Sequence, residues 1–160
     1  MILRLTAKSL KKIRTTEIDH EENQEKEKSL NEWYVNHFTL DRKGFFIITE
    51  SKSLYSKIVP SAGSSKRKAF EVMIKNAFQE IENDHDFAKD KLSEEDMLIC
   101  KTNNRSILGS QTDLIRMAKG IYYCHFEDAD LSKINETPMS YTGSFPNKDI
   151  MEEIRKRKCF

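Results

Sequence analysis

The spacing of apolar residues along the chain predicts five strands. They cover residues 1–5, 32–40, 45–50, 55–59 and 97–102. The turn-forming run at 41–44 separates two of them, which is typical of a β-hairpin. The second arm of this hairpin, 45–49, is apolar at successive positions, so we expect it to lie centrally in the sheet with both faces buried.

Two longer segments have the apolar period of helices. In the first, predicted at 66–82, the stripe consists of Phe70, Met73, Ile74, Ala77, Phe78 and Ile81. In the second, predicted at 110–123, it consists of Leu114, Met117, Ala118, Ile121 and Tyr122. Stripes of this kind belong to the core, so no cofactor role is assigned to them. Both helices are expected to cover a sheet.

The second helix has a recognisable start and an uncertain end. Gly109 permits a tight turn, Ser110 is a typical N-cap, and Asp113 stands three residues later, as in an acidic capping box. The helix is predicted to run past Gly120. The alternative is that Gly120 ends it, in which case residues 121–126 would form a strand.

Shorter elements complete the prediction. Thr6 can cap a brief helix that extends to Ile13, and a further helix is expected at 128–135, before Pro138. The chain should close with a short helix at 149–158. Residues 15–28 hold six carboxylates and one aliphatic residue, which predicts a mobile acidic loop.

These elements predict one α+β domain spanning residues 1–160. Its sheet would be mostly antiparallel, with the helices at 66–82 and 110–123 packed on one face. A chain of 160 residues is long enough for one core and too short for two comfortable domains.

The net charge and the cysteine content narrow the class of protein and its cellular compartment. The 27 basic and 26 acidic residues give a formal net charge of +1, so no global field draws the molecule to nucleic acid or to a membrane. No apolar run approaches the ~20 residues that span a bilayer, and the first residues do not form a signal peptide. Cys100, Cys124 and Cys159 are odd in number and form no C-x-x-C pair. We therefore predict a cytoplasmic protein.

The strongest candidate for a binding site lies between the last predicted strand and the second helix. The polar residues there are Thr102, Asn103, Asn104, Arg105 and Ser106. A guanidinium suits a carboxylate or phosphate, and the free N–H groups of a helix start favour an anion. We predict a non-catalytic binding module for an anionic group at this loop, with Trp33 and Thr137 nearby. The alternative is turn chemistry alone, with the arginine paired to a carboxylate.

A second hypothesis is a metal-dependent nuclease or phosphoesterase. Asp41, Glu50 and Lys52 have the D…E-x-K form in which carboxylates hold Mg²⁺ and the lysine steers water. These residues also suit a turn and a strand exit, so both interpretations stay open. Motifs for nucleotide-binding loops and serine hydrolases are absent from the sequence. The four histidines are dispersed, and we predict neither a metal site nor a cofactor.

Three clusters of basic residues are candidates for contact with nucleic acid. One cluster, at 8–14, contains Lys8, Lys11, Lys12 and Arg14; the others lie at 66–68 and 155–158. Each could neutralise phosphates, but each could equally be a solvated face.

Several segments together resemble a small prokaryotic family known only as a domain of unknown function. They are M-I-L-R-L-T at 1–6, L-N-E-W-Y at 30–34, the strand and exit at 46–60 with L-Y-S at 54–56, the block at 101–113 and N-E-T-P-M at 135–139. The resemblance implies a single-domain cytoplasmic protein and brings no catalytic residues. The family usually carries Asn before the Asp of the 101–113 block, whereas Thr112 stands here.

Overall fold

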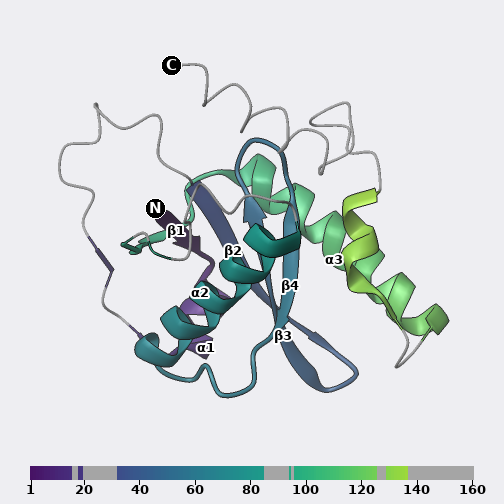
Figure 1. Cartoon of the computed structure of the whole chain (residues 1–160), viewed down its shortest axis with the longest axis horizontal. Coiled ribbons are helices and arrows are strands. Elements are labelled where there is room, and N and C mark those ends of the chain that lie inside the picture. Colours follow the sequence, from purple (N-terminus) through teal and green to yellow (C-terminus); the bar gives the residue numbers. More distant parts are fainter. Residues whose placement is uncertain (16–17, 20–31, 85–93, 95, 126–128, 137–160) are drawn as a thin grey trace.

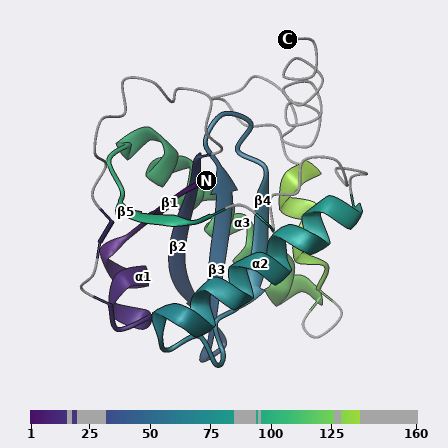
Figure 2. The same cartoon turned by 60° about the vertical axis from the view of Figure 1, so that its left-hand side comes forward.

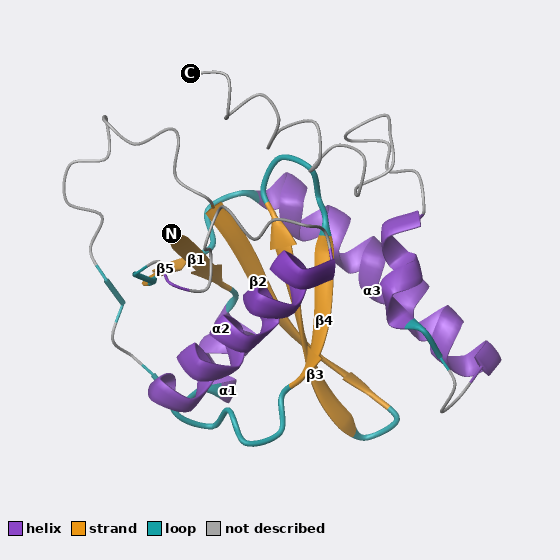
Figure 3. Cartoon of the chain, viewed as in Figure 1, coloured by secondary structure: helices purple, strands orange, loops and turns teal. Residues whose placement is uncertain are grey.

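Five strands form one twisted sheet, coloured orange in Figure 3. The computed structural model describes residues 1–15, 18–19, 32–84, 94, 96–125 and 129–136. The strands are β1 (Ile2–Leu5), β2 (Glu32–Leu40), β3 (Lys43–Glu50), β4 (Ser56–Pro60) and β5 (Leu98–Lys101). All five were predicted from the apolar spacing, with ends that differ by a residue or two.

The order of the strands in the sheet is β4-β3-β2-β1-β5. β3 is antiparallel to both of its neighbours, whereas β1 is parallel to both β2 and β5. The α+β class is confirmed, but the sheet is mixed rather than mostly antiparallel. The reason is connection length: β2, β3 and β4 follow one another through short turns, whereas a parallel strand needs a long crossover. Such crossovers follow β1 and β4.

Helices cover both faces of the sheet, not one face as predicted. Figure 1 shows α2 (Arg67–Asp84) in front of the strands and α3 (Arg105–His125) behind them. The reason is visible on β2, where Trp33 and Val35 belong to the core under α2 while Tyr34 and Phe38 belong to the core under α3. A strand that is apolar on both faces needs a cover on both sides.

Two short helices complete the described fold. α1 (Ala7–Lys12) lies on the same face as α2, and Thr6 caps it by accepting a hydrogen bond from the Ser9 N–H at 3.3 Å, as predicted. The segment predicted as a helix at 128–135 contains a 3₁₀-helix, η4 (Leu131–Glu136), beside β4. The predicted acidic loop at 15–28 falls mostly outside the described residues, and Thr137 and the predicted helix at 149–158 fall entirely outside them.

At each open edge of the sheet, one residue from outside the sheet bonds to the backbone of the edge strand. At β5, the Asp19 carboxylate accepts the Ile99 N–H at 2.7 Å, and the Asp19 N–H donates to the Ile99 carbonyl at 2.8 Å. At β4, the Asn135 amide accepts the Ser56 N–H and donates to the Ser56 carbonyl, both at 2.8 Å. Each contact occupies the backbone groups of one residue of the edge strand, which leaves fewer groups there to pair with another chain.

Candidate functional site

The polar segment after β5 is partly the first turn of α3. Asn104 is the N-cap, because its Oδ1 accepts hydrogen bonds from the N–H groups of Ser106 at 3.0 Å and Ile107 at 3.3 Å. The predicted cap at Ser110 is therefore wrong, and Ser110 lies inside the helix. Asp113 does not reach back to a helix start; its carboxylate accepts a hydrogen bond from Arg116 at 3.0 Å.

The misplaced start has a physical explanation. Asn is as good an N-cap as Ser, and the buried stripe of α3 extends back through Gln111 to Ile107. Gly109 suggested a turn, but it lies within the helix and a Cβ there would meet nothing within 4 Å. The prediction that the helix continues past Gly120 is confirmed, since α3 ends at His125.

The loops after β1 and β5 meet at a topological switch point. The two strands are parallel neighbours, so their carboxyl ends lie at the same edge of the sheet, and the Thr102 N–H donates to the Leu5 carbonyl at 3.2 Å. The chain then leaves β1 for α1 on one face and leaves β5 for α3 on the other, as Figure 2 shows. In open, mostly parallel α/β sheets, ligands bind at such switch points, and this mixed sheet has the same parallel arrangement in its β1–β5 pair.

Polar side chains gather at this edge of the sheet, which we call the switch-point corner (Thr6, Asn36 and 102–106). The Tyr34 hydroxyl donates to Asn103 Oδ1 at 2.7 Å, which anchors the loop to β2. The Thr6 hydroxyl donates to Asn36 Oδ1 at 3.1 Å. Within the described part of the chain, the exposed side chain of Arg105 has no hydrogen-bond or ion-pair partner. A cation at a helix start with no internal carboxylate remains available to an anion from outside.

Trp33 does not join the switch-point corner. Its side chain points to the opposite face of the sheet, where its ring packs edge-on against Phe78 at a centroid distance of 4.9 Å. It is 1% exposed, and its Nε1 is buried without a partner. Of the residues that the sequence singled out, the structure thus brings 102–106 together and leaves Trp33 in the core.

A buried polar network runs from this corner across the sheet. Gln111, 0% exposed on α3, donates from Nε2 to the Tyr34 carbonyl at 2.9 Å and to Thr49 Oγ1 at 3.0 Å. The Ser56 hydroxyl donates its hydrogen to the Leu54 carbonyl at 3.0 Å. The Thr49 hydroxyl must therefore donate to Ser56 Oγ, 2.8 Å away.

The network ends at η4, where Asn135 bonds the Ser56 backbone. Its members come from the segments that carry the family resemblance: Tyr34 from L-N-E-W-Y, Ser56 from L-Y-S, Asn103 and Gln111 from the 101–113 block, and Asn135 from N-E-T-P-M. One more of these segments, M-I-L-R-L-T, joins L-N-E-W-Y where the Arg4 side chain pairs with the Glu32 carboxylate. The structural role of the shared segments is therefore to hold β2, β3, β4, α3 and η4 in register.

The D…E-x-K residues do not form a cluster. Asp41 lies in the β2–β3 turn, whereas Glu50 pairs with Trp33 at the other end of the same hairpin. Seven residue steps along β3, from Lys43 to Glu50, correspond to ~24 Å. Glu50 is only 4% exposed, and its Oε2 accepts hydrogen bonds from the N–H groups of Lys52 at 2.9 Å and Ser53 at 2.7 Å. Its role in the structure is to close the β3–β4 turn.

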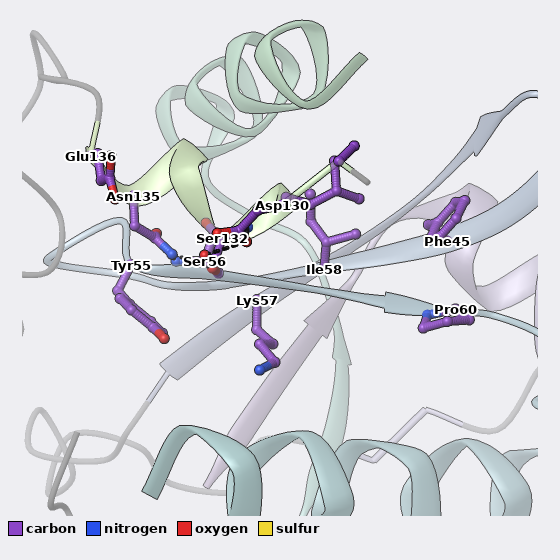
Figure 4. Close-up of a pocket in the computed structure, with 12 residues that line it drawn as sticks. Phe45, Tyr55, Ser56, Lys57, Ile58, Pro60, Asp130, Ser132, Asn135 and Glu136 are labelled. Carbon is purple, nitrogen blue, oxygen red and sulfur yellow. Dashed lines mark hydrogen bonds between the residues drawn. The ribbon is translucent and has the colours of Figure 1, made fainter. Parts of the chain in front are cut away.

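A pocket of about 650 Å³ lies between β4 and η4 (Figure 4). In the close-up, Lys57 and Tyr55 project to the α2 side of the strand, away from η4. The polar groups around it already have partners in the protein: Asn135 bonds Ser56, Lys57 pairs with Glu80 at 3.0 Å, and Asp130 accepts hydrogen bonds from Ser132. These Ser132 hydrogen bonds also lower the pKa of Asp130. The pocket therefore presents fewer unbonded polar groups to a ligand than the switch-point corner does, among the residues that the structure describes.

A protein-family model matches residues 2–149, and its description is domain of unknown function (DUF6933). The chain belongs to this family. The match confirms the resemblance drawn from the sequence, and it spans every described strand and helix of the DUF6933 fold. Comparison with curated proteins finds no match, and neither does comparison with solved structures.

In the described part of the DUF6933 chain, no group of three or more His, Cys, Asp or Glu side chains could hold a metal ion. In the same part of the chain, no helix has the length and apolar character needed to cross a membrane.

Sequence reasoning missed the central residue of the network. Gln111 was passed over because a single glutamine within an apolar stripe looks like a position on the stripe's polar border. One signal was present, since 111 continues the spacing of Ile107, Leu114 and Ala118 and a polar residue on that face must be buried. Buried amides need partners, so a polar network could have been inferred.

Proposed function

We propose that this protein is a non-catalytic binding module that takes a small anionic ligand at the switch-point corner. The observation that carries the proposal is the exposed Arg105 guanidinium, which has no partner among the described residues. It stands in the first turn of a 21-residue helix, at the edge of the sheet where the chain leaves two parallel strands for opposite faces.

The rest of the switch-point corner supports an anion. Asn104 uses Oδ1 for capping and Asn103 uses Oδ1 for Tyr34, and no described residue accepts a hydrogen bond from the N–H₂ group of either amide. The hydroxyl of Ser106 is exposed. The N-terminus of α3 adds its partial positive charge. A carboxylate or phosphate placed here would meet donors of the guanidinium, amide and hydroxyl types together.

Thermal shift with inorganic phosphate tests the proposal. Phosphate binding at the corner should raise the melting temperature with concentration, and Arg105→Ala should abolish the rise without changing the melting temperature in phosphate-free buffer. Arg116→Ala is the matched control, because Arg116 is an exposed arginine about three turns further along α3. A phosphate response that survives in Arg105→Ala, or is lost equally in Arg116→Ala, would refute the assignment of the site.

The alternative, a nuclease or phosphoesterase that uses Asp41, Glu50 and Lys52, has less support because the turn and the strand exit lie at opposite ends of the hairpin. It makes a separate prediction, namely a rise in melting temperature with Mg²⁺ that Asp41→Asn removes. Asp41 is the appropriate position because it is exposed, whereas a change at Glu50 would also disturb the β3–β4 turn.

A cytoplasmic location also remains a prediction. It is supported by the cysteines, of which Cys100 and Cys124 are both free thiols in the structure.

A further inference from the structure

A second surface, made of residues other than those of the switch-point corner, carries six cations that form no ion pair with any residue the structure describes. It consists of α1, the second residue after α1, and two lysines at the start of α2, and we call it the basic face: Lys8, Lys11, Lys12, Arg14, Lys66 and Lys68. In Figures 1 and 2 alike, α1 lies beside the first turn of α2. Two of the basic clusters that the sequence showed as separate runs are therefore joined into one surface.

The acidic groups described near this surface are already engaged. Asp19 accepts a hydrogen bond from Arg67 at 2.8 Å, and Glu71 accepts another from the same guanidinium at 2.9 Å. The remaining carboxylates of the 16–31 segment lie outside the described residues. The positive potential acts on His37, whose pKa is lowered first by burial and then by Lys12 and Lys8.

The backbone at Arg14 gives an independent indication. Arg14 has φ of 50° and stands where glycine is favoured, because the Thr15 N–H reaches back to the Leu10 carbonyl at 3.3 Å to close the helix end. A side chain in this left-handed conformation is strained. Strain that persists at a position where glycine would relieve it is a reason to look for a role of the side chain. Here the side chain adds a cation to the basic face.

We propose that the basic face binds the phosphodiester backbone of nucleic acid, without preference for base sequence. Lys8, Lys11 and Lys12 recur at helical spacing along one row of α1, so their ammonium groups can contact successive phosphates. A membrane surface fits less well, because peripheral helices insert apolar side chains. The apolar residues of α1 and its end, Leu10 and Ile13, are packed into the core under α2.

Fluorescence anisotropy with a labelled mixed-sequence single-stranded oligonucleotide of about 20 nucleotides, titrated at several salt concentrations, tests the proposal. Binding should weaken as salt rises, and charge reversal in Lys8→Glu/Lys11→Glu should abolish it. Reversal of two lysines elsewhere, in Lys119→Glu/Lys133→Glu, should leave most of it. Equal loss in both double variants would overturn the proposal, because it would show a response to net charge alone.

The sharpest variant is Arg14→Gly, because it separates binding from stability. Relief of strain should raise the melting temperature, while loss of one phosphate contact should weaken binding and reduce the slope of log K against log salt by about 1. Arg42→Gly is the matched control. Arg42 is also left-handed, with φ of 62°, but it lies at the tip of the β2–β3 hairpin, away from α1 in Figure 1.

Arg42→Gly should therefore gain stability and bind like the wild type. Unchanged binding in Arg14→Gly would overturn the proposal, as would binding of the wild type to phosphatidylserine vesicles without any binding to the oligonucleotide. Phosphate binding at Arg105 is measured in a different variant, so the two proposals can fail separately.

Discussion

At the scale of single residues, Gln111 is a fully buried polar side chain that ties α3 to two strands of the sheet. Its Nε2 joins the β2 backbone at Tyr34 to the hydroxyl of Thr49 on β3. Its Oε1 is buried without a partner. The amide orientation is fixed, because the Tyr34 carbonyl can only accept and so must face the Nε2 group. Gln111 therefore positions α3 on the sheet through directional bonds as well as apolar packing.

Replacing Gln111 by Ala should be strongly destabilising. The Tyr34 carbonyl and the Thr49 hydroxyl would lose their shared donor in a dry interior, which should lower the free energy of unfolding by about 2–4 kcal/mol. Thr112→Ala, one residue along on the exposed side of α3, should change it by less than about 0.5 kcal/mol. Urea denaturation of the two variants measures both values, and similar small effects would show that the network is not a source of stability.

The surroundings of His37 disfavour its protonated form. Its Nε2 lies 3.2 Å from the buried Ser61 hydroxyl, and its ring packs edge-on against Phe46. A Cβ on Gly44 would collide with that hydroxyl, so glycine is required where the strand passes this contact. Burial, and then the charges of Lys12 and Lys8, lower the pKa of His37 below its ordinary value of about 6.5.

This pKa shift predicts how stability depends on pH. Below pH 6.5, His37 binds a proton in the unfolded chain, whereas in the folded chain it binds one only at lower pH. The unfolded state therefore binds more protons between these two pKa values. The free energy of unfolding should therefore fall as pH drops from about 6.5 towards the lower folded-state pKa. In His37→Gln, which cannot titrate, this part of the pH dependence should disappear. Denaturation curves between pH 7 and 5 provide the test, and an unchanged profile in His37→Gln would contradict it.

At the scale of elements, the start of α3 positions the proposed site. The Asn104 cap fixes the direction in which the first turn leaves β5, and the Tyr34–Asn103 bond ties the preceding residue to β2. Arg105 therefore stands on a fixed helical turn rather than on a free loop. A site on a rigid element holds its donors in place before a ligand arrives.

The N-cap of α3 is Asn104 in the structure, whereas the sequence predicted Ser110. Asn104→Ala should lower the free energy of unfolding by about 1 kcal/mol, the usual effect of losing an N-cap. Ser110→Ala, at the cap predicted from the sequence, should have an effect within about 0.5 kcal/mol, because it lies inside the helix. Chemical denaturation distinguishes the two positions, and the reverse order of effects would contradict the structure.

At the scale of the whole molecule, the sequence predicted the fold best in segments where a single pattern of apolar spacing dominates. The apolar spacing of 32–50 predicted a hairpin of two strands, and the stripe from Phe70 to Ile81 predicted a helix on the sheet. Strand direction was not encoded in that spacing, because parallel and antiparallel neighbours bury the same alternate side chains. The two-sided burial of β3 was recognised, yet its consequence, a helix on each face, was not drawn.

The candidate site was predicted less completely than the fold. The polar cluster at 102–106 was visible in the sequence, because donors concentrate there in a short run. Its partners were not, since Tyr34 is 69 positions from Asn103, and only folding brings the end of β1 beside the end of β5. Trp33 was misplaced for a simple reason, namely that successive residues of a strand point to opposite faces.

The most direct test of the central claim is a phosphate titration followed by amide NMR. If the switch-point corner binds anions, the N–H resonances of residues 103–107 should shift together and saturate, and the shifts should vanish in Arg105→Ala while persisting in Arg116→Ala. Shifts that saturate elsewhere in the wild type, or that persist at 103–107 without the Arg105 guanidinium, would contradict the account.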